Sequence, residues 1–133
     1  TRDRRQRQMC IRDSSRIESW KIKIQDTIAD NASCGIFVLG EDSCAPDKFS
    51  MDELEVIVYK NGEFLSTGKG SAVQGHPAEA VAWLANTLGE YDIPLLKGEF
   101  ILSGSLVPLE PAVSGDVFFM ELKGVGTCEI NFS

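Results

Sequence analysis

Apolar and polar residues alternate in several short stretches of this chain, as expected for strands that bury one face. The first stretch covers residues 54–58, and an Asn61-Gly62 pair separates it from a second one at Phe64 and Leu65. Asn-Gly in this position is the strongest short-range signal of a β-hairpin. Near the C-terminus, the alternation predicts two further strands that place Glu121, Glu129 and Asn131 outside. Their apolar positions form one layer: Phe118, Met120, Leu122, Cys128, Ile130 and Phe132.

A helix is predicted over about residues 77–89. Pro77 suits the first helical position, His76 falls in the N-cap region, and Gly89 provides a stop. Trp83 is expected to pack at the edge of the apolar stripe. That stripe has helical spacing and comprises Val81, Leu84, Ala85 and Leu88.

The remaining apolar stretches favour short strands at residues 34–39 and 99–103. Residues 67–71, with two glycines, are interpreted as a flexible lead into the helix. No internal repeat is visible. The pattern as a whole predicts an α+β fold, a strand-rich mixed β-roll or barrel with one main packed helix at about 77–89.

The first 14 residues differ from the rest, with five Arg and little apolar periodicity. A basic disordered arm, a nucleic-acid contact and a transit peptide are possible interpretations. We favour another: residues 4–14 resemble the translated sequence of a library adapter, so residues 1–14 are treated as a non-native or disordered segment. Removing these five Arg and two Asp from 13 basic and 20 acidic residues leaves 8 and 18, a net charge of −10 rather than −7.

An acidic domain without a basic patch argues against nucleic acid or an anionic membrane as a partner. Residues 15–133 fit one domain or part of one.

The four cysteines form no CxxC pair, and one His leaves too few ligands for a zinc site. With no signal peptide and no apolar run long enough to span a membrane, we expect a cytoplasmic protein with reduced thiols.

Residues 26–35 place small and polar side chains between two apolar runs, which suits a tight loop facing a ligand. By residue type alone, Asp26, Asp30 and Asn31 could be metal ligands, acid–base groups or turn formers. Ser33 is a weak candidate nucleophile, because no GxSxG context surrounds it. Cys34 is better explained as a small buried residue than as a reactive thiol.

Two further positions could carry chemistry. His76 is better explained as a residue of the helix start than as a catalytic base. Ser103-Gly104-Ser105, at the end of a predicted strand, is similar to turns that bind an oxyanion or a carboxylate, although many turns share this composition. Composition and spacing alone name no reaction.

Several blocks in fixed order resemble the C-terminal half of the 2-oxopent-4-enoate (2-hydroxypenta-2,4-dienoate) hydratases of aromatic meta-cleavage pathways, in the fumarylacetoacetate hydrolase superfamily. The blocks are SRI at 15–17, WKIKIQDT at 20–27, ADNASCG at 29–35, LSTG at 65–68, VAWLANTLG at 81–89 and ILSGSLVPLEP at 101–111.

The resemblance implies a lyase that ketonises 2-hydroxypenta-2,4-dienoate and adds water to give 4-hydroxy-2-oxopentanoate, with Mg²⁺ or Mn²⁺ as Lewis acid. Asp30 and Asn31 become the catalytic candidates, and Ser33, Ser103 and Gly104 the substrate-binding candidates. The family's Glu-x-Glu pair, its further Glu and an acid–base Lys would lie upstream of Ser15. We therefore expect no metal ligand in this chain, and a fragment that is inactive alone.

Three alternatives stay open. The first is 4-oxalocrotonate decarboxylase, and the second is 2-oxohept-4-ene-1,7-dioate hydratase, both of the same superfamily. The third is a small non-catalytic β-rich binding module. By analogy with the family, the whole protein is expected to form a homo-oligomer and to associate with a partner decarboxylase.

Overall fold

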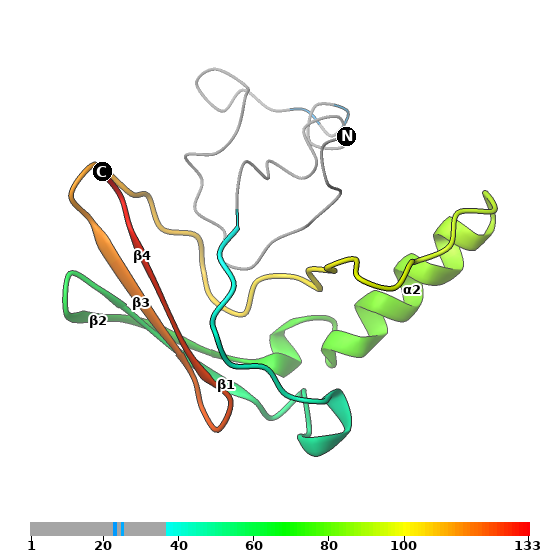
Figure 1. The fold of residues 1–133 in the computed structure, drawn as a ribbon, viewed down its shortest axis with the longest axis horizontal. Coiled ribbons are helices and arrows are strands. Elements are labelled where there is room, and N and C mark those ends of the chain that lie inside the picture. The colour runs from blue at the N-terminus through cyan, green and yellow to red at the C-terminus, as the bar shows by residue number, and fades with distance from the viewer. Residues whose placement is uncertain (1–22, 24, 26–36) are drawn as a thin grey trace.

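The computed structural model describes residues 23, 25 and 37–133 of the chain. Two antiparallel hairpins lie on either side of one helix in the sequence, and Figure 1 shows how the chain connects them. The elements are η3 (Pro46–Lys48), β1 (Glu55–Lys60), β2 (Glu63–Lys69), η4 (Gly70–Ala72), α2 (Pro77–Gly89), β3 (Val117–Leu122) and β4 (Gly126–Asn131).

The predicted Asn-Gly hairpin is confirmed. Asn61 and Gly62 join β1 to β2 with φ angles of 53° and 82°, so both lie in the left-handed region. Two such residues form the turn whose twist matches that of paired strands, which explains why the sequence places Asn-Gly there. The hairpin is one edge of a four-stranded sheet with the order β2-β1-β3-β4.

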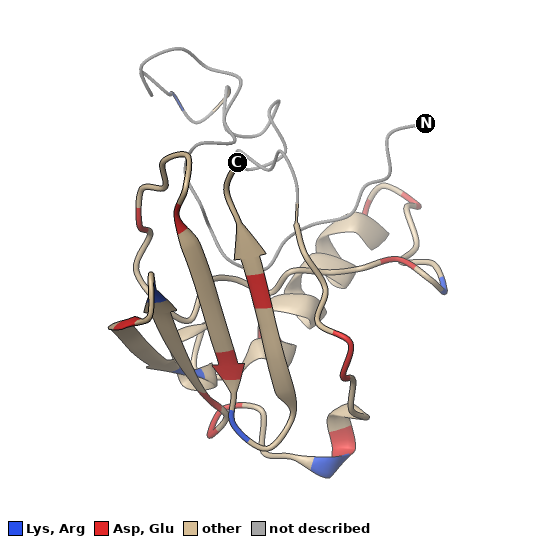
Figure 2. Cartoon of the chain, turned by 60° about the vertical axis from the view of Figure 1, so that its left-hand side comes forward, with Lys and Arg blue, Asp and Glu red and all other residues tan. Residues whose placement is uncertain are grey.

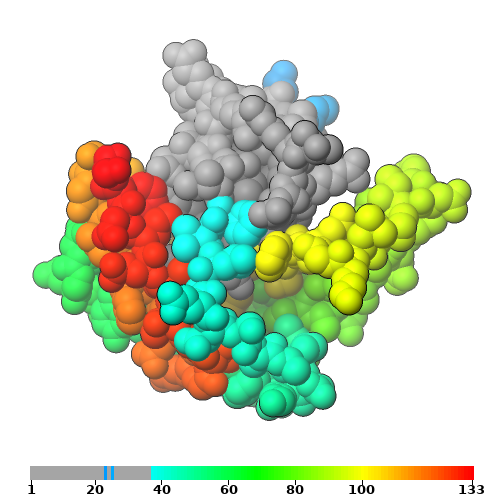
Figure 3. All heavy atoms as spheres, in the orientation of Figure 1, coloured from blue at the N-terminus to red at the C-terminus, as the bar shows by residue number. Residues whose placement is uncertain are grey.

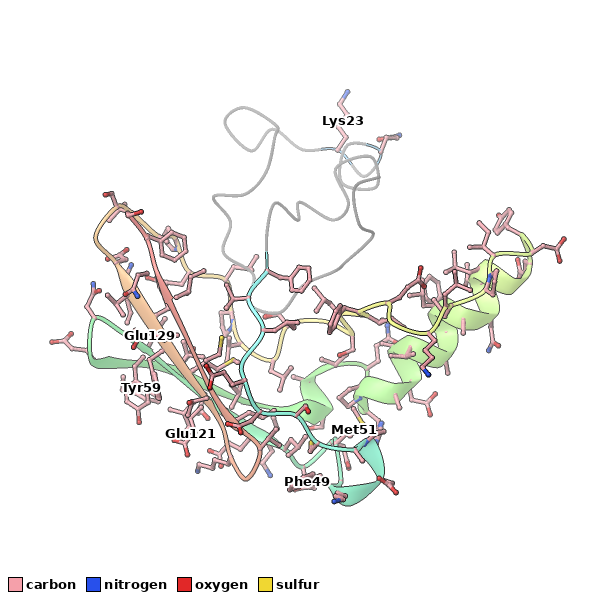
Figure 4. The ribbon with its side chains drawn as sticks, viewed as in Figure 1. Lys23, Phe49, Met51, Tyr59, Glu121 and Glu129 are labelled. Atoms are coloured by element: carbon pink, nitrogen blue, oxygen red, sulfur yellow. The ribbon has the colours of Figure 1, made fainter. Side chains whose placement is uncertain are left out.

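The second hairpin is also confirmed, with the predicted period of two. Phe118 pairs with Ile130 and Met120 with Cys128, so these side chains share one face of the sheet. Glu121 and Glu129 lie on the opposite face together with Tyr59, as Figure 4 shows. The sheet and helix together confirm the predicted α+β class.

The core lies on the inner face of the two central strands. Val58 and Phe118 are each 2% exposed, and Val56 lies beside them. The Phe118 ring meets the Phe132 ring edge-on, with 5.8 Å between centroids. Residues from the 106–112 segment pack against this cluster and cover the sheet from one side.

Helix α2 has the predicted bounds and the predicted start. The imidazole Nδ1 of His76 accepts a hydrogen bond from the Ala78 N–H at 3.1 Å, which satisfies one of the free donors of the first turn. The apolar stripe of the helix is only half-buried, and Trp83 is 62% exposed, so its predicted packing was wrong. The helix and the segment after it project from the sheet as an arm (Figure 3).

Two predicted strands are corrected where the structure describes them. Residues 99–103 are irregular, because Glu99 closes a local turn: its N–H donates to the Leu96 carbonyl at 3.1 Å and its carboxylate accepts from the Leu96 N–H at 2.8 Å. Residues 37–39 of the predicted 34–39 strand are likewise irregular. The Phe37 ring packs against that of Phe100, with centroids 5.9 Å apart.

Candidate functional site

A cavity of about 160 Å³ lies on the inner face of the sheet. Strands β1 and β3 form one wall, and residues 51–54 and 101–107 form the others. Figure 4 places Met51 on this inner side, near the start of α2 and away from Tyr59 and Glu121. The lining residues are Met51, Leu54, Val56, Gly70, Pro77, Ile101, Leu102, Ser103, Gly104, Ser105, Leu106, Val107, Met120 and Leu122.

Two glycines of the predicted flexible segment bring the walls of the cavity together. A Cβ on Gly70 would collide with the Met51 carbonyl oxygen, and one on Gly68 would collide with that of Leu106. The Gly70 N–H donates to the Leu54 carbonyl at 2.8 Å. Residues 67–71 are therefore a close-packed junction rather than a flexible lead, and only glycine allows the backbones to approach this far.

Ser103, Gly104 and Ser105 form the polar edge of the cavity. The Ser105 hydroxyl donates to the Val107 carbonyl at 2.6 Å and so stabilises the turn itself. The Ser103 hydroxyl makes no hydrogen bond to another residue within the described part of the chain. Gly104 has a φ of 144°, and a Cβ there would lie 3.2 Å from Cγ1 of Val73, so this position requires glycine. The structure thus leaves Ser103 available to a ligand.

The other predicted site residues, Asp30, Asn31 and Ser33, lie outside the described residues, as do Asp26 and Cys34. The described chain resumes at Phe37, whose ring contacts Phe100, three residues before Ser103. The segment that follows the predicted loop therefore meets the segment that leads into the serine turn.

The cavity lining does not fit a divalent cation. It offers hydroxyl groups, backbone atoms and apolar carbons, but no carboxylate or imidazole. Within residues 23, 25 and 37–133, no group of three or more His, Cys, Asp or Glu residues could hold a metal ion. The described residues can therefore contact a substrate, and a cation would need ligands from elsewhere.

Residues 8–133 match the family described as fumarylacetoacetate (FAA) hydrolase, C-terminal. The chain belongs to this family. It is 59% identical over 119 residues to 2-hydroxyhexa-2,4-dienoate hydratase of Comamonas testosteroni, covering 90% of this chain and 45% of the relative. It is 43% identical over 118 residues to 2-keto-4-pentenoate hydratase of Paraburkholderia xenovorans, and this alignment covers 89% of this chain and 44% of the relative.

The fold agrees with this assignment to the FAA hydrolase family. A solved structure of 4-oxalocrotonate decarboxylase from Pseudomonas putida G7, complexed with magnesium and adipate, superposes with a TM-score of 0.82 and 36% identity. The alignment covers 90% of this chain and 45% of that one. The chain thus spans about 45% of the length of the relatives it matches.

The surroundings of His76 and Cys128 in this FAA hydrolase family member point to structural roles. Nδ1 of His76 is engaged at the helix start, and its Nε2 lies 3.9 Å from the carboxylate of Asp52, which confirms the helix-start interpretation. Burial raises the pKa of the Cys128 thiol, which disfavours a reactive thiolate.

A charge network around Asp116 serves the fold in the described part of this chain. Asp116 accepts from the Asn61 amide at 2.9 Å and from the Val113 N–H at 2.9 Å, and lies 3.2 Å from Nζ of Lys60. These contacts, led by the Asn61 hydrogen bond, hold the pKa of Asp116 below its ordinary value. The network thereby links the β1–β2 turn to the start of β3.

Figure 2 shows that Asp and Glu residues are spread over both strands and loops.

Sequence reasoning predicted Ser103 and Gly104, which line the cavity, as site residues, but it did not predict the apolar walls. Met51, Leu54, Met120 and Leu122 come from segments far apart in the sequence, and no local pattern links them. Gly68, inside β2, was the available signal, because a glycine in a strand often marks a close backbone approach. No helix among the described residues is long and apolar enough to cross a membrane.

Proposed function

We propose that this chain is the C-terminal part of a metal-dependent hydro-lyase of aromatic catabolism. The whole enzyme adds water to 2-hydroxypenta-2,4-dienoate or a close homologue to give the 4-hydroxy-2-oxo acid. The observation that carries the proposal is the cavity, in which an available hydroxyl at Ser103 borders an apolar space of about 160 Å³. It occurs in a chain 59% identical to a dienoate hydratase.

In this proposal, Ser103 and the backbone at Gly104 bind the carboxylate end of the substrate. A hydroxyl that donates to a carboxylate makes a stronger hydrogen bond than one between neutral groups. Asp30 and Asn31 act in proton transfer or water positioning, and Ser33 binds substrate, as the family resemblance suggests. The contact between the Phe37 and Phe100 rings supports a shared site. Phe37 follows Ser33 by four residues, and Phe100 precedes Ser103 by three.

We assign Mg²⁺ or Mn²⁺ to Glu carboxylates of the whole enzyme that lie upstream of Ser15. The decarboxylase structure complexed with magnesium supports a divalent cation in this family, and hard oxygen ligands suit both ions. The described residues contribute substrate contacts to this arrangement. A cytoplasmic location, homo-oligomerisation and association with a decarboxylase remain predictions for the whole protein.

A decarboxylase is the second candidate, favoured by the fold similarity to 4-oxalocrotonate decarboxylase. The identities favour a hydratase, at 59% and 43% for the two hydratases against 36% for the decarboxylase. The two reactions can be separated by product, because one releases CO₂ and the other consumes water.

The test is a fusion of residues 15–133 to the upstream half of the Comamonas hydratase. We expect loss of dienol absorbance from 2-hydroxypenta-2,4-dienoate in the presence of Mg²⁺ or Mn²⁺, and no CO₂ release from 2-oxohex-3-enedioate. The Ser103→Ala variant of the fusion lacks this hydroxyl and should have a kcat/KM about tenfold to a hundredfold lower, since it loses a hydrogen bond to the charged carboxylate of the substrate.

The matched control is Ser114→Ala, an exposed serine in the turn before β3, which should leave kcat/KM unchanged. A folded fusion that binds the cation but turns over no dienol would refute the hydratase proposal. CO₂ release without hydration would instead support the decarboxylase.

A further inference from the structure

The side chain of Val73 touches the serine turn, residues 103–105, from outside the cavity. A Cβ on Gly104 would lie 3.2 Å, 3.4 Å and 3.8 Å from Cγ1, Cγ2 and Cβ of Val73, so the branched end of the valine fills the space beside this glycine. Val73 is itself buried, at 5% exposure. Gly104 lines the cavity, whereas Val73 does not. The valine therefore supports the turn without lining the space that a ligand would occupy.

The backbone of Val73 is fixed relative to the sheet. Its N–H donates to the Gly70 carbonyl at 3.0 Å, and the Gly70 N–H donates to the Leu54 carbonyl at 2.8 Å. The Ser71 N–H donates to the Asp52 carbonyl, also at 2.8 Å. Leu54 directly precedes β1, so these hydrogen bonds connect the valine to a central strand of the sheet. Val73 is thus held by backbone contacts that do not involve the serine turn.

The serine turn needs such a support at Gly104. The φ of 144° at this residue lies in a region that favours glycine, and glycine has the widest conformational freedom of any residue. The hydrogen bond from the Ser105 hydroxyl to the Val107 carbonyl acts on the part of the turn after Gly104. A valine suits the contact at Gly104 itself, because branching at Cβ restricts its χ1 angle and keeps its two methyl groups in defined places.

We infer that Val73 is a positioning residue of the substrate site: its γ-methyl groups hold Gly104 so that the Ser103 hydroxyl and the Gly104 backbone keep the geometry that binds the substrate carboxylate. The inference rests on the proposed function, which places the carboxylate at this turn. A displacement of about 1 Å in a binding group can lower a rate by about a hundredfold. The loss of two methyl groups beside the turn should therefore be measurable in the kinetics.

The first test is Val73→Ala in the fusion of residues 15–133 with the upstream half of the Comamonas hydratase. The change removes both γ-methyl groups and frees space beside Gly104. We expect kcat/KM for 2-hydroxypenta-2,4-dienoate to fall by about tenfold, chiefly through a higher KM, because the carboxylate carries the same charge in the substrate and in the transition state. Val113→Ala is the matched control: this valine is 67% exposed, and its truncation should leave kcat and KM unchanged.

Val73→Thr separates positioning from stability. Threonine keeps the branched shape beside Gly104 but buries a hydroxyl, so it should lower the melting temperature of the fusion while kcat/KM stays within about twofold of the parent value. Because this variant keeps the packing, it also tests the inference if Val73→Ala does not fold. A loss of kcat/KM of about tenfold in folded Val73→Thr would contradict a role that depends on the shape of the side chain.

The second test combines Val73→Ala with Ser103→Ala. If the valine acts through the serine turn, its truncation should lower kcat/KM by only about threefold or less once the Ser103 hydroxyl is absent, since coupled sites are not additive. An equal loss in both backgrounds, or a folded Val73→Ala fusion with the parent kcat/KM, would overturn the inference and leave the hydratase proposal intact. No turnover by the parent fusion would instead count against the proposed function, and the inference would fall with it.

Discussion

The inner face of the sheet and the arm formed by α2 and residues 90–100 both carry clear apolar patterns, yet only the first is buried. Phe118 and Val58 are each 2% exposed, whereas Trp83 is 62% and Tyr91 71% exposed. The sheet buries its apolar face because two hairpins bring four strands and the 106–112 segment together. Periodicity thus identifies an element and its apolar face but does not specify what covers that face.

The largest expected effect comes from emptying the inner face. Phe118→Ala should lower the free energy of unfolding by about 3–5 kcal/mol, because it removes a fully buried ring and leaves a cavity. Phe64→Ala, which truncates an exposed phenylalanine on β2, should cost about 1 kcal/mol or less. Urea unfolding measures the free energy of unfolding of both variants. An equal decrease in the two variants would contradict the assignment of Phe118 to the core.

The next effect tests the glycine junction. Gly70→Ala should destabilise the chain by about 1–3 kcal/mol, since its Cβ collides with the Met51 carbonyl and forces the cavity walls apart. Gly89 is the last residue of α2, and a Cβ there would meet no atom within 4 Å, so Gly89→Ala should be neutral or stabilise by about 0.5–1 kcal/mol. Thermal melts compare the two, and a neutral Gly70→Ala would show that the junction is loose.

A smaller, pH-dependent effect is expected at the Asp116 network. The folded-state pKa of Asp116 lies below its ordinary value of 3.8, chiefly through the Asn61 hydrogen bond, so ionised Asp116 stabilises the fold. This contribution is fully present above the ordinary pKa and is lost as pH falls through the folded-state pKa. The melting temperature of the unmodified chain should therefore exceed that of Asp116→Asn at pH 6, with the gap closing toward pH 2.

Glu63→Gln, at an exposed residue of β2 beside the same hairpin turn, is the control for this pH series. Its melting temperature should follow that of the unmodified chain throughout. A gap between Asp116→Asn and the unmodified chain that stays constant from pH 6 to pH 2 would rule out ionised Asp116 as its source.

The smallest effect is expected on the arm. Trp83→Ala should change the stability of this chain by about 0.5 kcal/mol or less, because the side chain is mostly exposed. Chemical denaturation checks this value. A loss as large as that of Phe118→Ala would show that the arm is packed in solution and would remove the contrast between the two regions.

Elements with strong local signals could be predicted from the sequence. The Asn61-Gly62 turn requires left-handed backbone, and Pro77 with His76 starts a helix, so both are encoded within a few residues. The predicted strand at 99–103 failed because the local turn of Glu99 with Leu96 replaced strand pairing.

The candidate site likewise has one part with a local sequence signal and one part without. The composition of the Ser103-Gly104-Ser105 turn indicated a ligand-binding edge, and the structure places that turn at the cavity. The apolar walls depend on contacts between residues some 70 positions apart, such as Met51 and Leu122, which no local pattern encodes. For the same reason, the sequence could not show that Gly68 and Gly70 meet carbonyl groups of distant segments.

The central claim, that this cavity is the substrate site of a dienoate hydratase, is tested most directly by a crystal structure. The fusion of residues 15–133 with the upstream half of the Comamonas hydratase would be crystallised with Mg²⁺ and 2-oxopentanoate, a substrate analogue without the reactive double bond. We predict that the carboxylate of the analogue lies within hydrogen-bond distance of Ser103 and its alkyl end lies between Met120 and Leu122. A bound analogue that contacts neither the serine turn nor β3 would contradict the claim.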